Sequence, residues 1–348
     1  AYIEHAHFPR GTDDDTILRV LNRSPQLRDV LLLDVGDAAV ERAFRLPRLK
    51  KLVVFANGLQ RLPESIVLLR SRLTSLHFSD LSLAAFPEPI CRISSLITLD
   101  LSWCSSLASL PESIGQLSSL ERLILLNCGR LTAIPDSIGR LSSLKTLNAS
   151  RCTSMRNLPR TLCLLSSLVE LDVSWCISLP GLRESICRLS SLQRLNLFNC
   201  CSIRALPKTI GQLSLKRLDL SGSICYPMHI PELHESIGSL SSLVVLDLAW
   251  CNRLAALPAS IGQLSSLEAL SLLRCSRILA LPDSIGQLSS LATLNLNDCS
   301  SLAALPESTG QLPESPSRSA ASLTTLNLSY CRNLAALPES TGQLSSLA

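Results

Sequence analysis

Aromatic and charged residues are scarce in this sequence. Among 348 residues, 3% are Phe, Trp or Tyr and 17% are Asp, Glu, Lys or Arg. A conventional packed core would use more aromatic side chains, so the composition excludes an ordinary globular domain of this length. The formal net charge of +4 is too small to indicate a general polyanion-binding protein.

Long apolar segments and a recognisable leader are also missing. Mean hydropathy is +0.30, yet no run of about 18 apolar residues occurs, so the sequence excludes a membrane-spanning helix. The first residues, beginning Ala1-Tyr2-Ile3, contain neither the basic stretch nor the apolar stretch of a secretory signal peptide. They also lack an initiator Met, and we expect a fragment or a processed chain.

Leucine is present in large excess, with 76 residues, and it recurs in the frame LxxLxLxxCxxLxxLPxxIxxL. The frame begins at Leu96 and restarts every 24 residues, at Leu120, Leu144, Leu168 and Leu192. After a shift of one residue it continues at Leu215, Leu243, Leu267, Leu291 and Leu323, and towards the N-terminus it reaches Leu73 and Leu49. A fixed period of this length is the signature of a solenoid.

This frame resembles that of leucine-rich repeat proteins, and the match covers roughly 300 residues of the chain. The LPxxIxxL half and the cysteine in the turn resemble two groups most. One is the repeat domain of plant intracellular disease-resistance receptors and of the related Ras-group proteins; the other is the repeat domain of plant-pathogen effectors. The resemblance implies a horseshoe-shaped α/β solenoid that binds macromolecules, usually proteins.

The residue pattern independently supports this fold. The segment LxxLxL alternates with a period of two, so each unit should begin with a short strand. One unit cannot bury its leucines alone, but stacked parallel strands make one continuous leucine core. In the second half of a unit, Pro111 takes a first-turn position and predicts a short helical or 3-10 turn. We therefore expect a parallel β-sheet on the concave face and short helical or 3-10 turns on the convex face.

The frame also predicts how the chain is organised. Residues 1–48 form an N-terminal cap and an irregular first repeat, with an acidic helix start at Asp13 and a second helix from Asp37 to Phe44. Twelve repeats fill residues 49–346, with insertions near 223–233 and 313–321 that we interpret as tolerated loop growth or, alternatively, as contact or phosphorylation sites. Residues 347–348 start an unfinished repeat, so we expect more chain or a partner to cover this end.

Cysteine occupies one position of the frame in nine repeats, and Asn57 occupies it in an earlier one. The cysteines of this ladder are Cys104, Cys128, Cys152, Cys176, Cys200, Cys251, Cys275, Cys299 and Cys331. Equivalent positions in single file have no natural pairing, so we expect buried reduced thiols that cap backbone groups of the neighbouring coil. Persistently free thiols predict the cytoplasm or another reducing intracellular compartment.

No catalytic or cofactor-binding signature is present. The motifs GxxxxGK[ST], GxGxxG, GxSxG and HExxH do not occur, and the five histidines are scattered. The cysteines form no CxxC pair. We therefore predict that the chain is not an enzyme and has no catalytic residue, no cofactor and no metal site.

Acidic and amide side chains recur between the last two leucines of LxxLxL. They are Asp100, Asn148, Asp172, Asn196, Asp219, Asp247, Asn295 and Asn327. This stripe is compatible with a solvated sheet surface, and also with hydrogen bonding to the backbone or basic side chains of a partner. We select Asp172 as a candidate partner-binding residue.

All three tryptophans of the chain occupy the position just before the ladder cysteine. This position holds Trp103, Trp175 and Trp250, together with Tyr330, Arg151 and Arg274. Phe198 and Phe55, one place earlier in their repeats, should project from the concave sheet. Because Trp, Tyr and Arg dominate interface hot spots, we predict that this position and Phe198 bind a partner. The alternative is that each ring packs flat over the neighbouring coils.

The leading hypothesis is a non-enzymatic scaffold that recognises one or more proteins of unknown identity through its concave face. A first alternative is the recognition module of a larger immune-type receptor or pathogen effector, whose signalling or catalytic domain lies outside this chain. A second is a structural subunit of a large assembly. Nucleic-acid binding is not favoured, because acidic residues dilute the basic cluster of Arg122, Lys145, Arg151, Arg194, Lys216 and Arg217.

Overall fold

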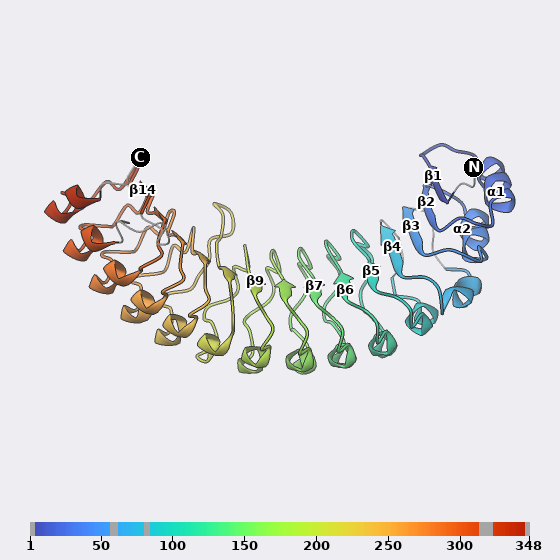
Figure 1. Cartoon of the computed structure of the whole chain (residues 1–348), viewed down its shortest axis with the longest axis horizontal. Helices are drawn as coiled ribbons and strands as arrows, with labels where there is room; N and C mark the ends of the chain where they lie inside the picture. Colours follow the sequence, from blue (N-terminus) through green and yellow to red (C-terminus); the bar gives the residue numbers. More distant parts are fainter. Residues whose placement is uncertain (1–3, 56–61, 80–83, 313–322, 345–348) are drawn as a thin grey trace. The chain divides into compact units, whose positions relative to one another are not determined.

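The computed structural model of the chain describes residues 4–55, 62–79, 84–312 and 323–344 (Figure 1). It divides into two compact units, Ala1–Glu170 and Leu171–Ala348. Asn57, the insertion at 313–321 and the unfinished repeat at 347–348 lie outside the described residues. No helix in the described part of the chain is long and apolar enough to cross a membrane.

The first unit begins with two helices, each of which follows a strand. The elements are β1 (His5–Phe8), α1 (Asp14–Arg23), β2 (Asp29–Leu33) and α2 (Asp37–Phe44). Asp13 caps α1, because its side chain accepts a hydrogen bond from the Thr16 backbone N–H at 2.8 Å. Both helices agree with the sequence prediction. Strand β1 was not predicted; it pairs in parallel with β2, with Phe8 opposite Leu32.

The repeats of the first unit alternate between a short strand and a 3-10 helix. The strands are β3 (Lys51–Phe55), β4 (Ser75–Ser79), β5 (Thr98–Asp100), β6 (Arg122–Ile124) and β7 (Thr146–Asn148). The 3-10 helices are η1 (Glu64–Leu69), η2 (Glu88–Arg92), η3 (Glu112–Gln116), η4 (Asp136–Arg140) and η5 (Arg160–Leu164). Strand β8 (Glu170–Asp172) lies at the boundary of the two units.

The second unit repeats the same arrangement. Its strands are β9 (Arg194–Asn196), β10 (Arg217–Asp219), β11 (Val245–Asp247), β12 (Ala269–Ser271), β13 (Thr293–Asn295) and β14 (Thr325–Asn327). Its 3-10 helices are η6 (Glu184–Arg188), η7 (Ile210–Gln212), η8 (Glu235–Ser239), η9 (Ala259–Gln263), η10 (Asp283–Gln287), η11 (Glu307–Gln311) and η12 (Glu339–Gln343). In each unit the strands line the inner side and the 3-10 helices line the outer side (Figure 1).

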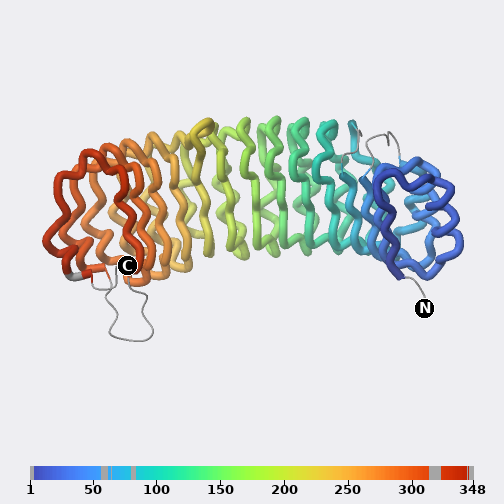
Figure 2. Tube along the Cα trace, turned by 90° about the horizontal axis from the view of Figure 1, so that it is seen from above, coloured from blue at the N-terminus to red at the C-terminus, as the bar shows by residue number. Residues whose placement is uncertain are grey.

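The leucines of the frame form the core between these two layers. Strand order follows chain order in both units and all described pairs are parallel, so equivalent leucines are neighbours, as in the Leu99–Leu123 and Leu123–Leu147 pairs. Leu120, Leu123 and Leu125 are fully buried. The coils stack side by side within each unit (Figure 2), which buries leucines that no single coil could bury. The predicted α/β solenoid, with a parallel sheet opposite short 3-10 turns, is confirmed.

The outer layer depends on a close approach between neighbouring 3-10 helices. Pro111 lies at the N-cap of η3, one residue before the predicted first-turn position, and its carbonyl accepts from the Ile114 N–H at 3.0 Å. A Cβ atom on Gly115 would lie 2.5 Å from the Ser137 carbonyl oxygen of the next repeat. The absence of a side chain on Gly115 therefore lets η3 and η4 approach each other this closely.

Candidate functional site

The tryptophans share a backbone conformation that is unusual for their residue type. The φ angles of Trp103, Trp175 and Trp250 are 65°, 60° and 62°. The equivalent residues Asn127, Arg151, Asn199, Arg274, Asp298 and Tyr330 have φ between 57° and 60°. We call these nine residues the turn positions. Left-handed backbone is tolerated by Gly, Asn and Asp but is an outlier for bulky side chains.

Hydrogen bonds between repeats impose this conformation. The Trp103 N–H donates to the Leu126 carbonyl at 2.7 Å, and the Trp250 N–H donates to the Leu273 carbonyl at 2.7 Å. Each bond continues the strand ladder one step into the turn, before the chain folds back towards the ladder cysteine. The conformation follows from stacking, whichever side chain occupies the position.

The acidic and amide stripe has a structural role that neither sequence interpretation included. The Asp172 Oδ1 atom accepts from the Ser174 backbone N–H at 2.8 Å, and the Asn295 Oδ1 atom accepts from the Asn297 N–H at 3.0 Å. The same bond to the second residue along is made by Asp100, Asn148, Asn196, Asp219, Asp247 and Asn327. These side chains satisfy backbone donors where the strand ends.

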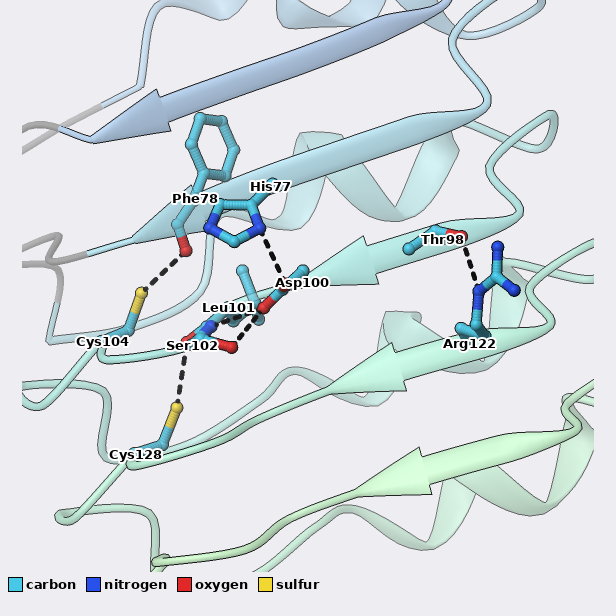
Figure 3. Close-up of polar contacts among 9 residues, drawn as sticks. All are labelled: His77, Phe78, Thr98, Asp100, Leu101, Ser102, Cys104, Arg122 and Cys128. Carbon is cyan, nitrogen blue, oxygen red and sulfur yellow. Dashed lines mark hydrogen bonds and ion pairs between the residues drawn. The ribbon is translucent and has the colours of Figure 1, made fainter. Parts of the chain in front are cut away.

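Asp172 and His77 make further contacts within this stripe. The Asp172 Oδ2 atom accepts from Asn196 Nδ2 at 3.2 Å, so both of its oxygens have intramolecular partners. His77 Nδ1 lies 2.7 Å from Asp100 Oδ2 (Figure 3). Sequence reasoning missed the second pair, although both residues hold the same frame position in adjacent repeats.

The pKa values of two carboxyl groups in the stripe are shifted in opposite directions. Burial acts to raise the pKa of Asp100, but hydrogen bonds from His77 and Ser102 outweigh it and hold that pKa below its usual value. Burial raises the pKa of Asp247, and the charge of Asp219 adds to this effect. Asp219 lies directly opposite Asp247 in the β10–β11 pair.

The predicted partner-binding residues of the second unit form two clusters. The Trp175 ring makes edge contacts with Phe198 and Tyr226, with centroid distances of 5.7 and 5.5 Å. The Arg274 guanidinium lies over the Trp250 ring, 4.4 Å from its centroid. Trp175 and Trp250 therefore contact side chains of neighbouring repeats, and both remain partly exposed.

The other candidate residues are more open. Trp103 is 51% exposed and Tyr330 is 71% exposed, and Arg151 is also exposed. Phe55 contacts the ring of His77 at a centroid distance of 5.2 Å. The structure therefore leaves Trp103 and Tyr330 as the most accessible aromatic turn positions.

Tyr226 was not among the candidates and comes from the insertion near 223–233. The Ser223 N–H donates to the Tyr226 carbonyl at 3.2 Å, and the Tyr226 N–H donates to the Ser223 carbonyl at 3.1 Å. Met228 and Ile230 are buried. The insertion is therefore anchored in the core, and it brings an aromatic ring onto Trp175.

The cysteine ladder agrees with its prediction. The thiols of Cys104 and Cys128 donate to the carbonyls of Phe78 and Leu101 at 3.6 and 3.2 Å (Figure 3). The same bond to the preceding repeat is made by Cys152, Cys200, Cys251, Cys275, Cys299 and Cys331. All 14 cysteines are free, and every ladder cysteine is buried except the half-buried Cys331.

Burial also makes these thiols poor acids. It raises the pKa of Cys299 to about 12, and it raises the pKa of Cys200, Cys251 and Cys275 as well. The described residues contain no group of three or more His, Cys, Asp or Glu side chains that could hold a metal ion.

A family model described as Leucine Rich Repeat matches residues 95–117 and 322–344. The two matched segments are leucine-rich repeats, and the parallel strands and leucine core of the described residues have the leucine-rich repeat fold. A comparison with curated proteins found no match.

Solved structures from several organisms are similar to this chain. A leucine-rich repeat protein of Leptospira interrogans is 27% identical with a TM-score of 0.68, and the match covers 93% of this chain and 83% of that one. An internalin of Listeria monocytogenes is 15% identical with a TM-score of 0.55, covering 97% and 94%. The ectodomain of a plant membrane receptor kinase from Arabidopsis thaliana, solved with Casparian strip integrity factor 2, is 21% identical with a TM-score of 0.47, covering 99% and 45%.

Proposed function

We propose that this chain is a non-enzymatic scaffold that binds a protein partner through the inner faces of its units and through its turn positions. One observation carries the proposal: Trp, Arg or Tyr occupies six of the nine turn positions. A bulky residue there costs about 1 kcal/mol more than Gly and is also less favourable than Asn or Asp. The exposed rings of Trp103 and Tyr330 recover little of this cost through packing.

The residue types support a binding role. Trp, Tyr and Arg are the side chains most enriched at interface hot spots. Leucine-rich repeat proteins are typically binding scaffolds, and extended concave surfaces are what solenoids use for recognition. Stacking imposes the left-handed conformation but does not require a large side chain there, so Trp, Tyr and Arg at these positions indicate a function outside folding.

Two finer assignments belong to the same proposal. The LPxxIxxL half and the ladder cysteines support a recognition module like those of plant intracellular resistance proteins, Ras-group proteins or plant-pathogen effectors. The free thiols support a cytoplasmic or other reducing compartment. The compartment is tested by purifying the protein from its natural source, denaturing it without reductant and alkylating its thiols. All 14 thiols should be modified, and disulfide-linked peptides would contradict the assignment.

A partner pull-down with mass spectrometry tests the binding role. The wild type is compared with the variant Trp103→Asn/Trp175→Asn/Trp250→Asn. Asparagine is chosen because Asn127 already holds this backbone conformation. The control variant Leu68→Gln/Leu164→Gln removes two exposed apolar side chains from the 3-10 helices instead. A protein captured by wild type and control but lost from the tryptophan variant supports the proposal, and identical partner lists overturn it.

A further inference from the structure

Asn199 is a turn position with an unusual environment. Its φ is 57°, and its N–H donates to the Ser221 carbonyl at 2.9 Å. The residue is 0% exposed, and within the described residues neither Oδ1 nor Nδ2 of its side chain has a hydrogen-bond partner. A buried amide that keeps a free donor and a free acceptor is unfavourable for folding.

The repeat itself does not require this burial. Asn127 has the same place in its repeat and a φ of 60°, but it is only partly buried. Both residues have a tryptophan at the turn position of the preceding repeat, Trp103 for Asn127 and Trp175 for Asn199. The repeat after Asn199 differs, because its insertion carries Tyr226.

The rings of Trp175 and Tyr226 meet over the repeat that contains Asn199. Their centroids are 5.5 Å apart, although parallel strands two repeats apart are separated by about 10 Å. The rings must therefore lean towards each other across the intervening repeat. Phe198, next to Asn199 in sequence, lines the same place, with its ring 5.7 Å from that of Trp175.

Tyr226 is a cover carried by the insertion. A Cβ atom on Gly222 would lie 2.7 Å from the Tyr226 carbonyl oxygen, so glycine lets the insertion pass close to the turn. Beyond Tyr226 the chain is anchored by buried Met228, whereas Ile224 before it is exposed. The Tyr226 side chain itself is only partly buried, so rotation about its side-chain bonds would uncover Trp175 without displacing buried Met228.

We propose that Asn199, Trp175 and Phe198 form a binding site for an extended peptide segment of a partner protein, with Tyr226 as its cover. The Asn199 amide presents one donor and one acceptor, which match the C=O and N–H of a peptide backbone. Tyr226 shows that an aromatic ring fits against Trp175, so the segment would place an aromatic side chain there. This inference rests on the proposed function and specifies the chemistry of the partner.

The surrounding charges favour a peptide over a nucleotide. An amide beside aromatic rings could also recognise a nucleobase. However, the strands that flank Asn196 carry the carboxyl groups of Asp172 and Asp219 at the ends nearest the turn, where they would repel a phosphate group. The basic side chains of Arg194 and Arg217 lie two residues further back along their strands. A peptide carries no such obligatory negative charge.

Selection of short random peptides displayed on phage against the full chain tests the proposal. Selected peptides are then measured on wild type, Asn199→Gly and the matched control Asn127→Gly. Glycine removes each amide without adding backbone strain. We expect aromatic-containing peptides that bind wild type and Asn127→Gly equally and bind Asn199→Gly at least about tenfold more weakly. N-methylation of one peptide amide should weaken binding to wild type but not to Asn199→Gly.

A second variant keeps the test decisive if Asn199→Gly does not fold. Tyr226→Ala removes the cover, so it should bind the selected peptides several-fold more tightly, whereas a purely structural Tyr226 would give unchanged or weaker binding. Equal peptide binding by wild type and Asn199→Gly overturns the inference, as does competition by adenosine monophosphate for this site. If the tryptophan variant loses its pull-down partner but Asn199→Gly retains it, the proposed function stands and only this inference fails.

Discussion

Arg274 lies over the ring of Trp250, with 4.4 Å between the guanidinium carbon and the ring centroid. Its Nε atom also lies 3.0 Å from Asp298 Oδ2. Trp250, Arg274 and Asp298 occupy three successive turn positions of the second unit. Side chains at these positions therefore contact one another along the stack, and substitutions differ in effect according to their neighbours.

Trp103→Asn should leave the protein as stable as wild type or stabilise it by about 0.5–1 kcal/mol, because Asn is less strained at φ 65° and the exposed ring gives up little packing. Trp175→Asn should instead destabilise by about 1–2 kcal/mol, because it loses its contacts with Phe198 and Tyr226. Chemical unfolding of both variants measures the difference. Equal destabilisation would show that the Trp103 ring contributes to packing after all.

Asp100→Asn and Asp247→Asn should change stability at neutral pH in opposite directions. The pKa of Asp100 is lowered in the folded protein. Its ionised form therefore adds to the free energy of unfolding above pH 3.8, the usual pKa, and this stabilisation is lost as the pH falls through the lower folded-state pKa. Asp100→Asn should cost about 1–2 kcal/mol, because it loses the charged partner of His77.

The pKa of Asp247 is raised in the folded protein. Its protonated form therefore adds to the free energy of unfolding at low pH, and this stabilisation is lost as the pH rises from 3.8 through the higher folded-state pKa. Asp247→Asn should stabilise by about 0.5–1 kcal/mol at pH 7, because it removes repulsion from Asp219 and keeps the oxygen that accepts from Ala249. Unfolding free energies at pH 7 and pH 3 check both predictions. The same sign for the two variants at pH 7 would contradict the assigned environments.

Thiol labelling of the native protein should be highly selective. Burial raises the pKa of Cys299 to about 12, so only about one thiol in 10,000 is ionised at pH 8, and the thiolate is the reactive form. Exposed Cys225 should react with iodoacetamide far faster than the buried ladder thiols. Peptide mapping by mass spectrometry follows each site. Labelling of Cys299 at the rate of Cys225 would show that the ladder opens readily.

Cys275→Ser should destabilise the protein by about 1–3 kcal/mol, because it puts a smaller and more polar side chain into the buried ladder. The wild-type thiol donates to the Leu248 carbonyl at 3.1 Å. Cys225→Ser is the matched control and should have little effect, since Cys225 is exposed. Chemical denaturation of both proteins gives the comparison, and equal stability would contradict a packing role for the ladder.

The repeat fold could be predicted because its cause is local. The spacing of Leu96, Leu99 and Leu101 defines the strand and its buried face in each unit. Strand β1 could not be found in this way, since it has no leucine frame and of its four residues only Phe8 is buried. It forms because β2 offers a parallel edge.

The conformations at the candidate site have distant causes. Tryptophan disfavours left-handed backbone, so nothing near Trp103 predicts its φ; a hydrogen bond to Leu126 in the next repeat imposes it. The contact between the Trp175 and Tyr226 rings joins the repeats on either side of Asn199. The hydrogen bonds between the stripe and the backbone could have been predicted from the sequence. Asp and Asn side chains commonly accept from the backbone N–H two residues later, as Asp100 does from Ser102.

The most direct test of the binding role is the dissociation constant of the captured partner, measured by titration calorimetry on purified full chains. Wild type is compared with Trp103→Asn/Tyr330→Asn, which alters the two most exposed aromatic turn positions. We predict a Kd at least about tenfold higher, with an unfolding free energy no lower than that of wild type. An unchanged Kd would contradict the claim that the turn positions exist to bind a partner.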